Sequence, residues 1–218
     1  MDPLIAVWPL FGLVIRTPRL VLTPVRDEHL PDLADAALAG IHDPAVMPFS
    51  FPWTDAPRDR LVTGLAAYQW RTRASCTPDN WTISFAVFHE DRLIGVQDVV
   101  ATNFGLLRQV VSGSWLTRTA QGQGLGWEMR AAVLQVAFDD LGATSAMSAA
   151  ADWNVASLAV SRKLGYSPNG VALVESRTGE VTREQKLLLA REAFVRPGWT
   201  AEVTGLEAAR AFLIPDDR

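Results

Sequence analysis

The chain has 218 residues, of which 49% are hydrophobic and 20% charged. This composition can bury a sizeable core and excludes a globally disordered chain. The net charge of −4 lacks the basic excess of a general nucleic-acid-binding protein, so we expect no nucleic-acid partner.

A single cysteine, Cys76, excludes a disulfide within the chain and suits a reducing cytoplasm, where we expect the protein to reside. Cys76 and the three histidines lack the spacing of metal ligands, so we expect no metal. The apolar residues 1–12 are interrupted by Pro3 and Pro9 and follow no positively charged region. They predict neither a signal peptide nor a membrane span, but an arm packed on the domain or on a partner subunit.

Hydrophobic alternation and helix-capping residues define the first elements. Within 13–25, Leu20 and Leu22 alternate with Val21 and Thr23, which predicts a strand flanked by Pro18 and Pro24. A helix is expected to begin at Asp27, as its N-cap, and to end near Leu38.

A loop rich in proline and aromatic residues spans 42–54, and it is apolar enough that we expect it to line or cover a cleft. The later patterns predict, in order, a helix at 55–74, a hairpin of strands at 81–88 and 93–101, a strand at 109–117, a helix at 124–141, a strand at 144–151, a helix at 154–163, strands at 171–175 and 186–194, and a short helix at 205–212. This order indicates one mixed α/β domain over 1–198, with 199–218 as a C-terminal extension.

The most informative segment is 114–126, where a predicted strand ends, a glycine-rich turn follows and a helix begins. Backbone N–H groups at a helix N-terminus lack intrahelical partners, and the helix dipole adds partial positive charge there. Glycines remove the Cβ atoms that would keep a ligand away, so the turn is a candidate cradle for a phosphate or diphosphate. A tight turn that simply needs glycine is the alternative.

Two other phosphate-binding motifs do not fit this segment. A P-loop needs lysine and then serine or threonine after its last glycine, but Trp127 and Glu128 follow Gly126. A dinucleotide-binding fingerprint spans six positions at the start of a βαβ unit, whereas Gly122, Gly124 and Gly126 alternate and follow a meander.

Four ordered blocks within about 13–195 resemble the GNAT superfamily, and within it the RimJ/RimL-like branch. The central block, 121–126, fits the signature Gln/Arg-x-x-Gly-x-Gly/Ala. The other blocks are 17–22, 113–116, and 154–157 with 163–166. The loop 47–53 and residues 108–109 are further similar to an actinobacterial subgroup that includes succinyl-CoA users.

The resemblance implies a single GNAT-like domain of mixed α/β (α+β) type. Its sheet would be mostly antiparallel with six to seven strands, a splayed strand pair and about four flanking helices. Acyl-CoA would be the co-substrate, with its diphosphate on the signature turn and its pantetheine arm along the fourth strand. The cofactor-binding residues that the resemblance implies are Trp115, Leu116, Thr117, Gln121, Gly122, Gln123, Gly124, Leu125, Gly126, Asn154, Ser157 and Ser161.

The resemblance also implies catalytic roles. A backbone amide near Leu116 would stabilise an oxyanion. Many family members place a tyrosine that protonates the departing thiolate at the position of Ser161, and a serine can instead donate a hydrogen bond to sulfur. The amine needs a base, for which the candidates are Asp98, Glu128 and Asp152, although proximity alone can supply much of the rate.

These features together predict an N-acyltransferase. It would move acetyl, or alternatively succinyl, from CoA to a primary amine by direct attack of that amine on the thioester. The amine would belong to a protein N-terminus, a lysine or a small molecule. Arg71, Arg73 and Arg108 are candidates for binding a carboxylated acyl tail or a ribose phosphate. The alternatives are a catalytically weak acyl-CoA-binding sensor module, because Ser161 replaces the tyrosine, and a nucleotide-binding oxidoreductase. The apolar arm and the tail from Trp199 predict a homo-oligomer.

Overall fold

The computed structural model describes residues 2–214. Within this range one sheet contains nine strands in the order β7-β8-β6-β5-β4-β3-β2-β1-β9. Neighbouring strands are antiparallel except β5 and β6, which are parallel. The strands are β1 (Val14–Arg16), β2 (Leu20–Pro24), β3 (Asn80–His89), β4 (Arg92–Thr102), β5 (Gln109–Leu116), β6 (Ser145–Ala151), β7 (Ser167–Arg177), β8 (Glu180–Ala190) and β9 (Glu202–Thr204). The mixed, mostly antiparallel sheet is confirmed, with more strands than expected.

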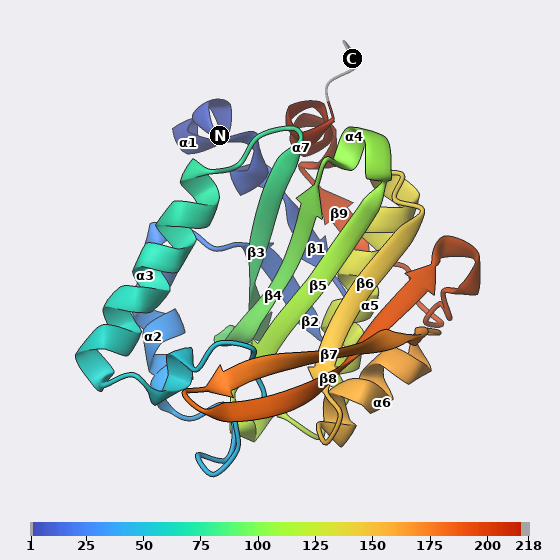
Figure 1. The fold of residues 1–218 in the computed structure, drawn as a ribbon. Coiled ribbons are helices and arrows are strands. Elements are labelled where there is room, and N and C mark those ends of the chain that lie inside the picture. Colours follow the sequence, from blue (N-terminus) through green and yellow to red (C-terminus); the bar gives the residue numbers. More distant parts are fainter. Residues whose placement is uncertain (1, 215–218) are drawn as a thin grey trace.

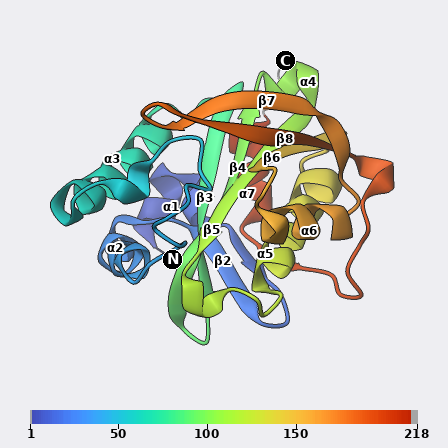
Figure 2. The same ribbon diagram turned by 60° about the horizontal axis from the view of Figure 1, so that its bottom comes forward.

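Helices cover both faces of this sheet, as Figures 1 and 2 show. On one face α2 and α3 pack against β4 and β3, and on the other α5 packs against β1, β2, β4 and β5 with α6 beside it. The helices of the described chain are α1 (Pro3–Val7), α2 (Leu30–Leu38), α3 (Arg58–Ala74), α4 (Phe104–Leu107), α5 (Leu125–Gln135), α6 (Val155–Lys163) and α7 (Leu206–Leu213). None of these is both long enough and apolar enough to cross a membrane.

The strand predicted between Pro18 and Pro24 is β2, and the strand β1, which precedes it and pairs with it in antiparallel orientation, was not predicted. Pro18 lies in the turn between them, and the Thr17 N–H donates to Leu20 O at 2.9 Å and closes it. β1 has only three residues, which are too few to show the alternation that predicts a strand.

Other local predictions also need correction. The Asp27 carboxylate accepts hydrogen bonds from Trp70 Nε1 and Arg73 Nη1 of α3, so it ties α3 to the start of the α2 segment instead of capping that helix. β7 extends beyond the strand predicted at 171–175 at both ends, whereas β8 begins and ends earlier than the strand predicted at 186–194. α1, α4 and β9 were not predicted.

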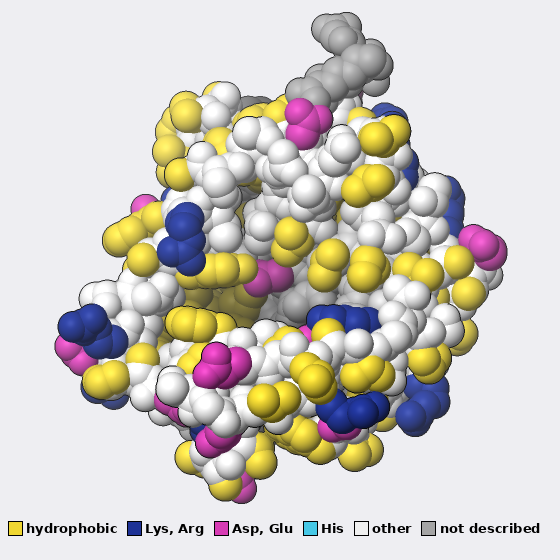
Figure 3. All heavy atoms as spheres, viewed as in Figure 1, with side chains coloured by type: hydrophobic (Ala, Val, Ile, Leu, Met, Phe, Trp, Pro, Cys, Tyr) yellow, Lys and Arg dark blue, Asp and Glu magenta, His cyan; other side chains and the backbone are white. Residues whose placement is uncertain are grey.

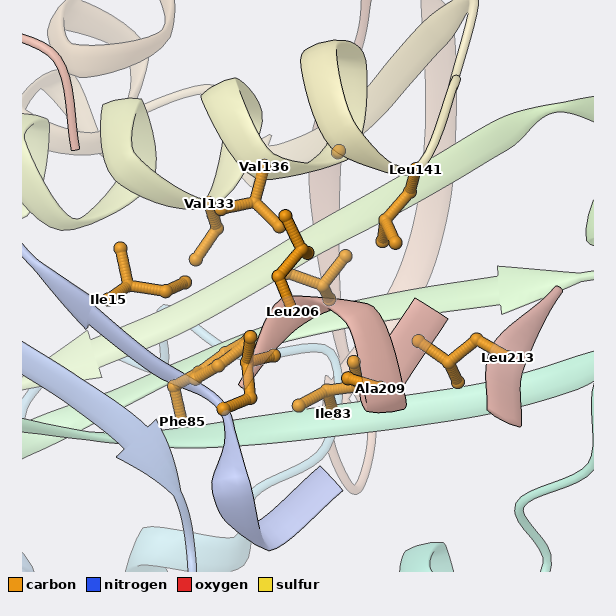
Figure 4. A pocket seen from close by; sticks show the side chains of 12 residues that line it. Ile15, Ile83, Phe85, Val133, Val136, Leu141, Leu206, Ala209 and Leu213 are labelled. Carbon is orange, nitrogen blue, oxygen red and sulfur yellow. The ribbon is translucent and has the colours of Figure 1, made fainter. Parts of the chain in front are cut away.

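Residues near both ends of the described chain pack on the main domain. β9 pairs with β1, and α7 buries Ala209 and Leu213 in the core. Trp8 meets Phe212 of α7 edge-to-face, with ring centroids 5.0 Å apart. A void of about 10 Å³ lies between α7, α5 and the sheet. Figure 4 shows the side chains that line it. Only apolar side chains line this void, so it belongs to the core and offers a ligand no polar partner.

The expected splayed strand pair is formed by β5 and β6. Their register extends only from Gln109 opposite Ser145 to Val111 opposite Met147. Beyond Val111 the two strands have no common register, whereas β5 stays paired with β4 as far as Leu116. The sheet therefore opens between the C-terminal halves of β5 and β6, and this opening lets a ligand reach the backbone.

Candidate active site

A cleft of about 700 Å³ lies at the splayed ends of β5 and β6. Its walls come from β5 and β6, the turn before α5, the first turns of α5 and α6, and the loop 41–50. The loop rich in proline and aromatic residues therefore lines a cleft, as expected. Figure 3 shows the face viewed in Figure 1 hollowed between α3 and the β7–β8 hairpin, with charged side chains among apolar ones around the hollow.

Most residues predicted to bind the cofactor meet around this cleft. Those in its lining are Trp115, Leu116, Gln121, Gly122, Gly124, Gly126, Asn154 and Ser157. Four others, Thr117, Gln123, Leu125 and Ser161, are not in the lining, and neither is Asp98. The signature turn, the end of β5 and the start of α6 are thus brought together, although the sequence separates them by up to about forty residues.

The open edge of β5 presents backbone amides to the cleft. The Thr117 N–H donates to Ile94 O of β4 at 2.8 Å. Because donors alternate in an antiparallel ladder, the Ser114 and Leu116 amides point away from β4, toward the splay. The amide predicted to stabilise an oxyanion, that of Leu116, is therefore directed at the cleft, whereas that of Thr117 is already bonded.

The turn before α5 has the features of an anion cradle. Gly122 and Gly124 adopt left-handed backbone with φ of 73° and 80°, which residues with a Cβ rarely adopt. The first helical bond of α5 joins Glu128 N–H to Gly124 O at 3.1 Å, so the amides of 125–127 precede it and have no helical acceptor. A Cβ placed on Gly122 would meet no atom within 4 Å, so the space beside the turn is open to a ligand.

Side-chain hydrogen bonds hold this turn in place. Gln121 Nε2 donates to Ile41 O at 2.6 Å and to Leu116 O at 2.9 Å, joining the turn to the cleft loop and to the end of β5. Gln123 Nε2 donates to Thr119 O at 2.7 Å. Gln121, predicted to bind the cofactor, thus shapes the turn through its own side chain.

Glu128, considered as a catalytic base, has a structural partner in Arg19. Its carboxylate is 2% exposed and receives Arg19 Nη2 at 2.6 Å, Arg19 Nε at 2.7 Å and Thr17 Oγ1 at 2.6 Å. These contacts join the β1–β2 turn to the first turn of α5 and leave the carboxylate little freedom to take a proton from an amine. Arg19 Nη1 also donates to Gln123 O at 3.0 Å, so its positive charge lies beside the signature turn.

The start of α6 forms the opposite wall. Asn154 Oδ1 accepts the Ser157 N–H at 3.1 Å, which confirms the predicted N-cap. Ser161, one turn further on, is fully buried. Its hydroxyl donates to Ser157 O at 3.1 Å and accepts from Arg130 Nη1 at 2.8 Å.

Comparisons with known proteins agree with this geometry. Residues 19–167 match the family model described as an acetyltransferase (GNAT) domain. The chain belongs to the GNAT acetyltransferase family. The solved structures that this GNAT chain resembles include proteins named RimJ and RimL, in agreement with the RimJ/RimL-like branch suggested by the sequence.

Three of those structures show how far the shared fold extends. Mycobacterium smegmatis RimJ in complex with CoA-disulfide is 17% identical, has a TM-score of 0.67, and the match covers 94% of this chain and 95% of that one. RimL, a ribosomal L7/L12 alpha-N-protein acetyltransferase in complex with coenzyme A, is 16% identical and has a TM-score of 0.65; the match covers 83% of this chain and 99% of that one. A spermidine N-acetyltransferase SpeG chimera from Vibrio cholerae and hSSAT is 16% identical and has a TM-score of 0.60; the match covers 80% of this chain and 96% of that one.

The two other candidate bases of this GNAT chain differ in setting. Asp98 on β4 accepts hydrogen bonds from Tyr68 Oη at 2.8 Å and from Ser84 Oγ. Burial raises the pKa of Asp98, and these two hydrogen bonds oppose that rise. A raised pKa suits a proton acceptor, but from outside the cleft lining Asp98 would act through water. Asp152 is exposed and pairs with Arg183 at 3.3 Å.

Sequence analysis missed two buried charged residues of the lining, Arg130 on α5 and Glu184 on β8. Arg130 lies four residues after Gly126, and this i, i+4 spacing puts both on one face of the helix. A charged residue inside the apolar run of 129–138 was therefore a usable signal. Glu184 gave no such signal, because its partner Ser50 lies 134 residues away.

The anion cradle predicts the effect of a charge placed on the turn. Gly124→Asp should raise the dissociation constant for CoA about tenfold or more, about 1.4 kcal/mol, because the new carboxylate repels the diphosphate. Gly170→Asp is the matched control, since Gly170 also has a left-handed φ, 95°, but lies on β7 outside the cleft lining. Calorimetric titration with CoA measures both variants. Equal affinity in Gly124→Asp and the native protein would place the diphosphate elsewhere.

Proposed function

We propose that this GNAT chain transfers an acyl group from acyl-CoA to a primary amine by direct attack. The proposal depends on the convergence of three features on one cleft: the amides in the first turn of α5, the open edge of β5, and the carboxylate of Glu184. The first suits a diphosphate. The second suits a pantetheine arm and a thioester carbonyl, and the third suits an ammonium group.

The Leu116 amide is the donor that we assign to the thioester carbonyl oxygen. Negative charge grows on that oxygen as the amine nitrogen attacks the carbonyl carbon, and an N–H group already fixed in a sheet stabilises it without reorganisation. A single donor of this kind accounts for about 10²–10³ in kcat in other acyl-transfer enzymes. Holding donor and acceptor together supplies further rate.

Acetyl-CoA is the donor that we propose, with succinyl-CoA as the second candidate. Arg71, Arg73 and Arg108, which were considered for a succinyl carboxylate, are not in the cleft lining. Succinyl-CoA stays a candidate because two other arginines, Arg118 and Arg130, are in the lining.

Glu184 is the acceptor-binding group in this proposal. It is 5% exposed and accepts hydrogen bonds from Ser50 Oγ and from Lys186 Nζ. Burial acts to raise the pKa of Glu184, but the hydrogen bonds from Lys186 and Ser50 outweigh it and hold the pKa below its ordinary value. The carboxylate is therefore ionised at neutral pH and favours a cationic amine. The RimL and SpeG names, which specify a protein alpha-amine and spermidine, support an amine acceptor.

Release of free thiol tests the proposed reaction. The protein is mixed with acetyl-CoA or succinyl-CoA and with a free α-amino peptide, a lysine side-chain amine or a polyamine. We expect thiol release that requires an amine and is faster with acetyl-CoA. Tight CoA binding without amine-dependent release would favour the sensor module, and a protein that binds no CoA would contradict both functions.

The assignment of Glu184 predicts a selective kinetic effect. Glu184→Gln should raise the KM for the amine about tenfold, about 1.4 kcal/mol, because the ammonium loses its counter-charge. The KM for acyl-CoA should change little. Glu180→Gln is the control, since Glu180 lies on the same strand with a 60% exposed side chain. Steady-state rates over both substrates separate the two constants, and an unchanged amine KM in Glu184→Gln would refute the assignment.

A further inference from the structure

Within the described residues, 2–214, Arg130 is a buried cation without a counter-ion. It is 5% exposed and lines the cleft from α5. Nη1 donates to Ser161 Oγ at 2.8 Å, Nη2 lies 3.5 Å from Ser114 Oγ, and Nε has no hydrogen-bond partner within the described residues. No ion pair involves Arg130 in residues 2–214, whereas the other buried charges of the cleft region, Glu128 and Glu184, are each paired.

This arrangement is energetically costly in the absence of a ligand. Burial lowers the pKa of Arg130, because a guanidinium is poorly solvated in the interior. The neighbouring titratable group is Tyr166, which is also buried, and burial raises the pKa of its phenol, so it stays neutral. A buried charge is normally paired, which indicates that the partner of Arg130 is an anion that enters the cleft.

The position of Arg130 selects which anion this is. It lies six residues beyond Gly124, about 9 Å along the axis of α5. It also faces Ser114 on the open edge of β5, where the pantetheine arm is proposed to lie. With the diphosphate on the turn and the arm extending inward along β5, the remaining group of CoA that can become anionic inside the cleft is its sulfur.

We infer that the Arg130 guanidinium stabilises the CoA thiolate that departs when the amide is made, an inference that rests on the proposed function. Ser161 is then a positioning residue. Its hydroxyl proton is engaged by Ser157 O, its oxygen accepts from Arg130, and it is not in the cleft lining. Arg130 therefore takes the role that a tyrosine fills in many relatives, by charge stabilisation without proton transfer.

The reaction forms a C–N bond and breaks the C–S bond of the thioester. The amine nitrogen forms the new C–N bond, and the carbonyl electron pair moves to oxygen, next to the Leu116 amide. When that pair returns, the C–S bond breaks and its electrons stay on sulfur, beside the guanidinium. The amine loses its proton to a base or to water. CoA leaves as a thiolate and takes a proton from solvent.

Ionisation of bound CoA tests this inference without turnover. The ultraviolet absorbance of the thiolate is followed against pH for free CoA and for CoA bound to the whole protein. The thiol of bound CoA should ionise about 1–3 pH units below that of free CoA, as expected for a group close to an opposite charge. Arg130→Met should abolish the shift, Arg130→Lys should retain part of it, and Arg162→Met, which changes an exposed arginine of α6, should leave it intact.

Kinetics supply the second measurement. Arg130→Met should lower kcat about 10²–10³-fold, the size found for other charge-stabilising donors, with a small change in the dissociation constant of acetyl-CoA. If Arg130→Met does not fold, the pH titration of the thiol of CoA bound to the native protein still tests the inference. An unshifted thiol in native protein, or a variant that alters only the preference for succinyl-CoA, overturns the inference while the proposed function stands. Failure to bind CoA would instead contradict the proposed function.

Discussion

The backbone amides of the first turn of α5, which have no helical acceptor, are the constraint on which the rest of the site depends. The first helical bond of α5 begins only at Glu128, and two left-handed glycines keep the approach to the earlier amides open. An anion can use these amides only if the adjoining sheet leaves room for the rest of the ligand. The divergence of β5 from β6 after Val111 provides that room, and it exposes the Ser114 and Leu116 amides along the same path.

Polar contacts hold this open geometry. Gln121 binds one carbonyl of the cleft loop and one at the end of β5, and the Glu128–Arg19 pair joins the helix start to the β1–β2 turn. On the other side of the loop, Ser50 donates to Glu184, and Arg177 Nη2 donates to Pro44 O at 2.8 Å. The cleft is therefore preformed, and Arg130 stands out as the buried charge that these networks leave for a ligand.

The sequence predicted the signature turn, the β3–β4 hairpin and the N-cap at Asn154, because each depends on residues close together in the chain. The mostly antiparallel sheet was implied by the resemblance to the GNAT superfamily. The sequence did not predict β1, whose three residues are too few to show an alternation. It also missed the contact of Arg130 with Ser161 and that of Glu184 with Ser50, since these join residues 31 and 134 positions apart. Whether a charged residue is a surface group or a ligand group depends on tertiary contacts that no local pattern records.

Glycine amide resonances offer the most direct measurement of the central claim. In protein labelled with ¹⁵N-glycine the fifteen glycines give few signals. Gly122 and Gly124 belong to the turn before α5, and Gly126 to the first turn of α5. Titration with CoA, and separately with inorganic pyrophosphate, should move the amide protons of these three downfield as they donate to the anion. If they stay in place while CoA binds and other glycine signals move, the diphosphate does not lie on the start of α5 and the account fails.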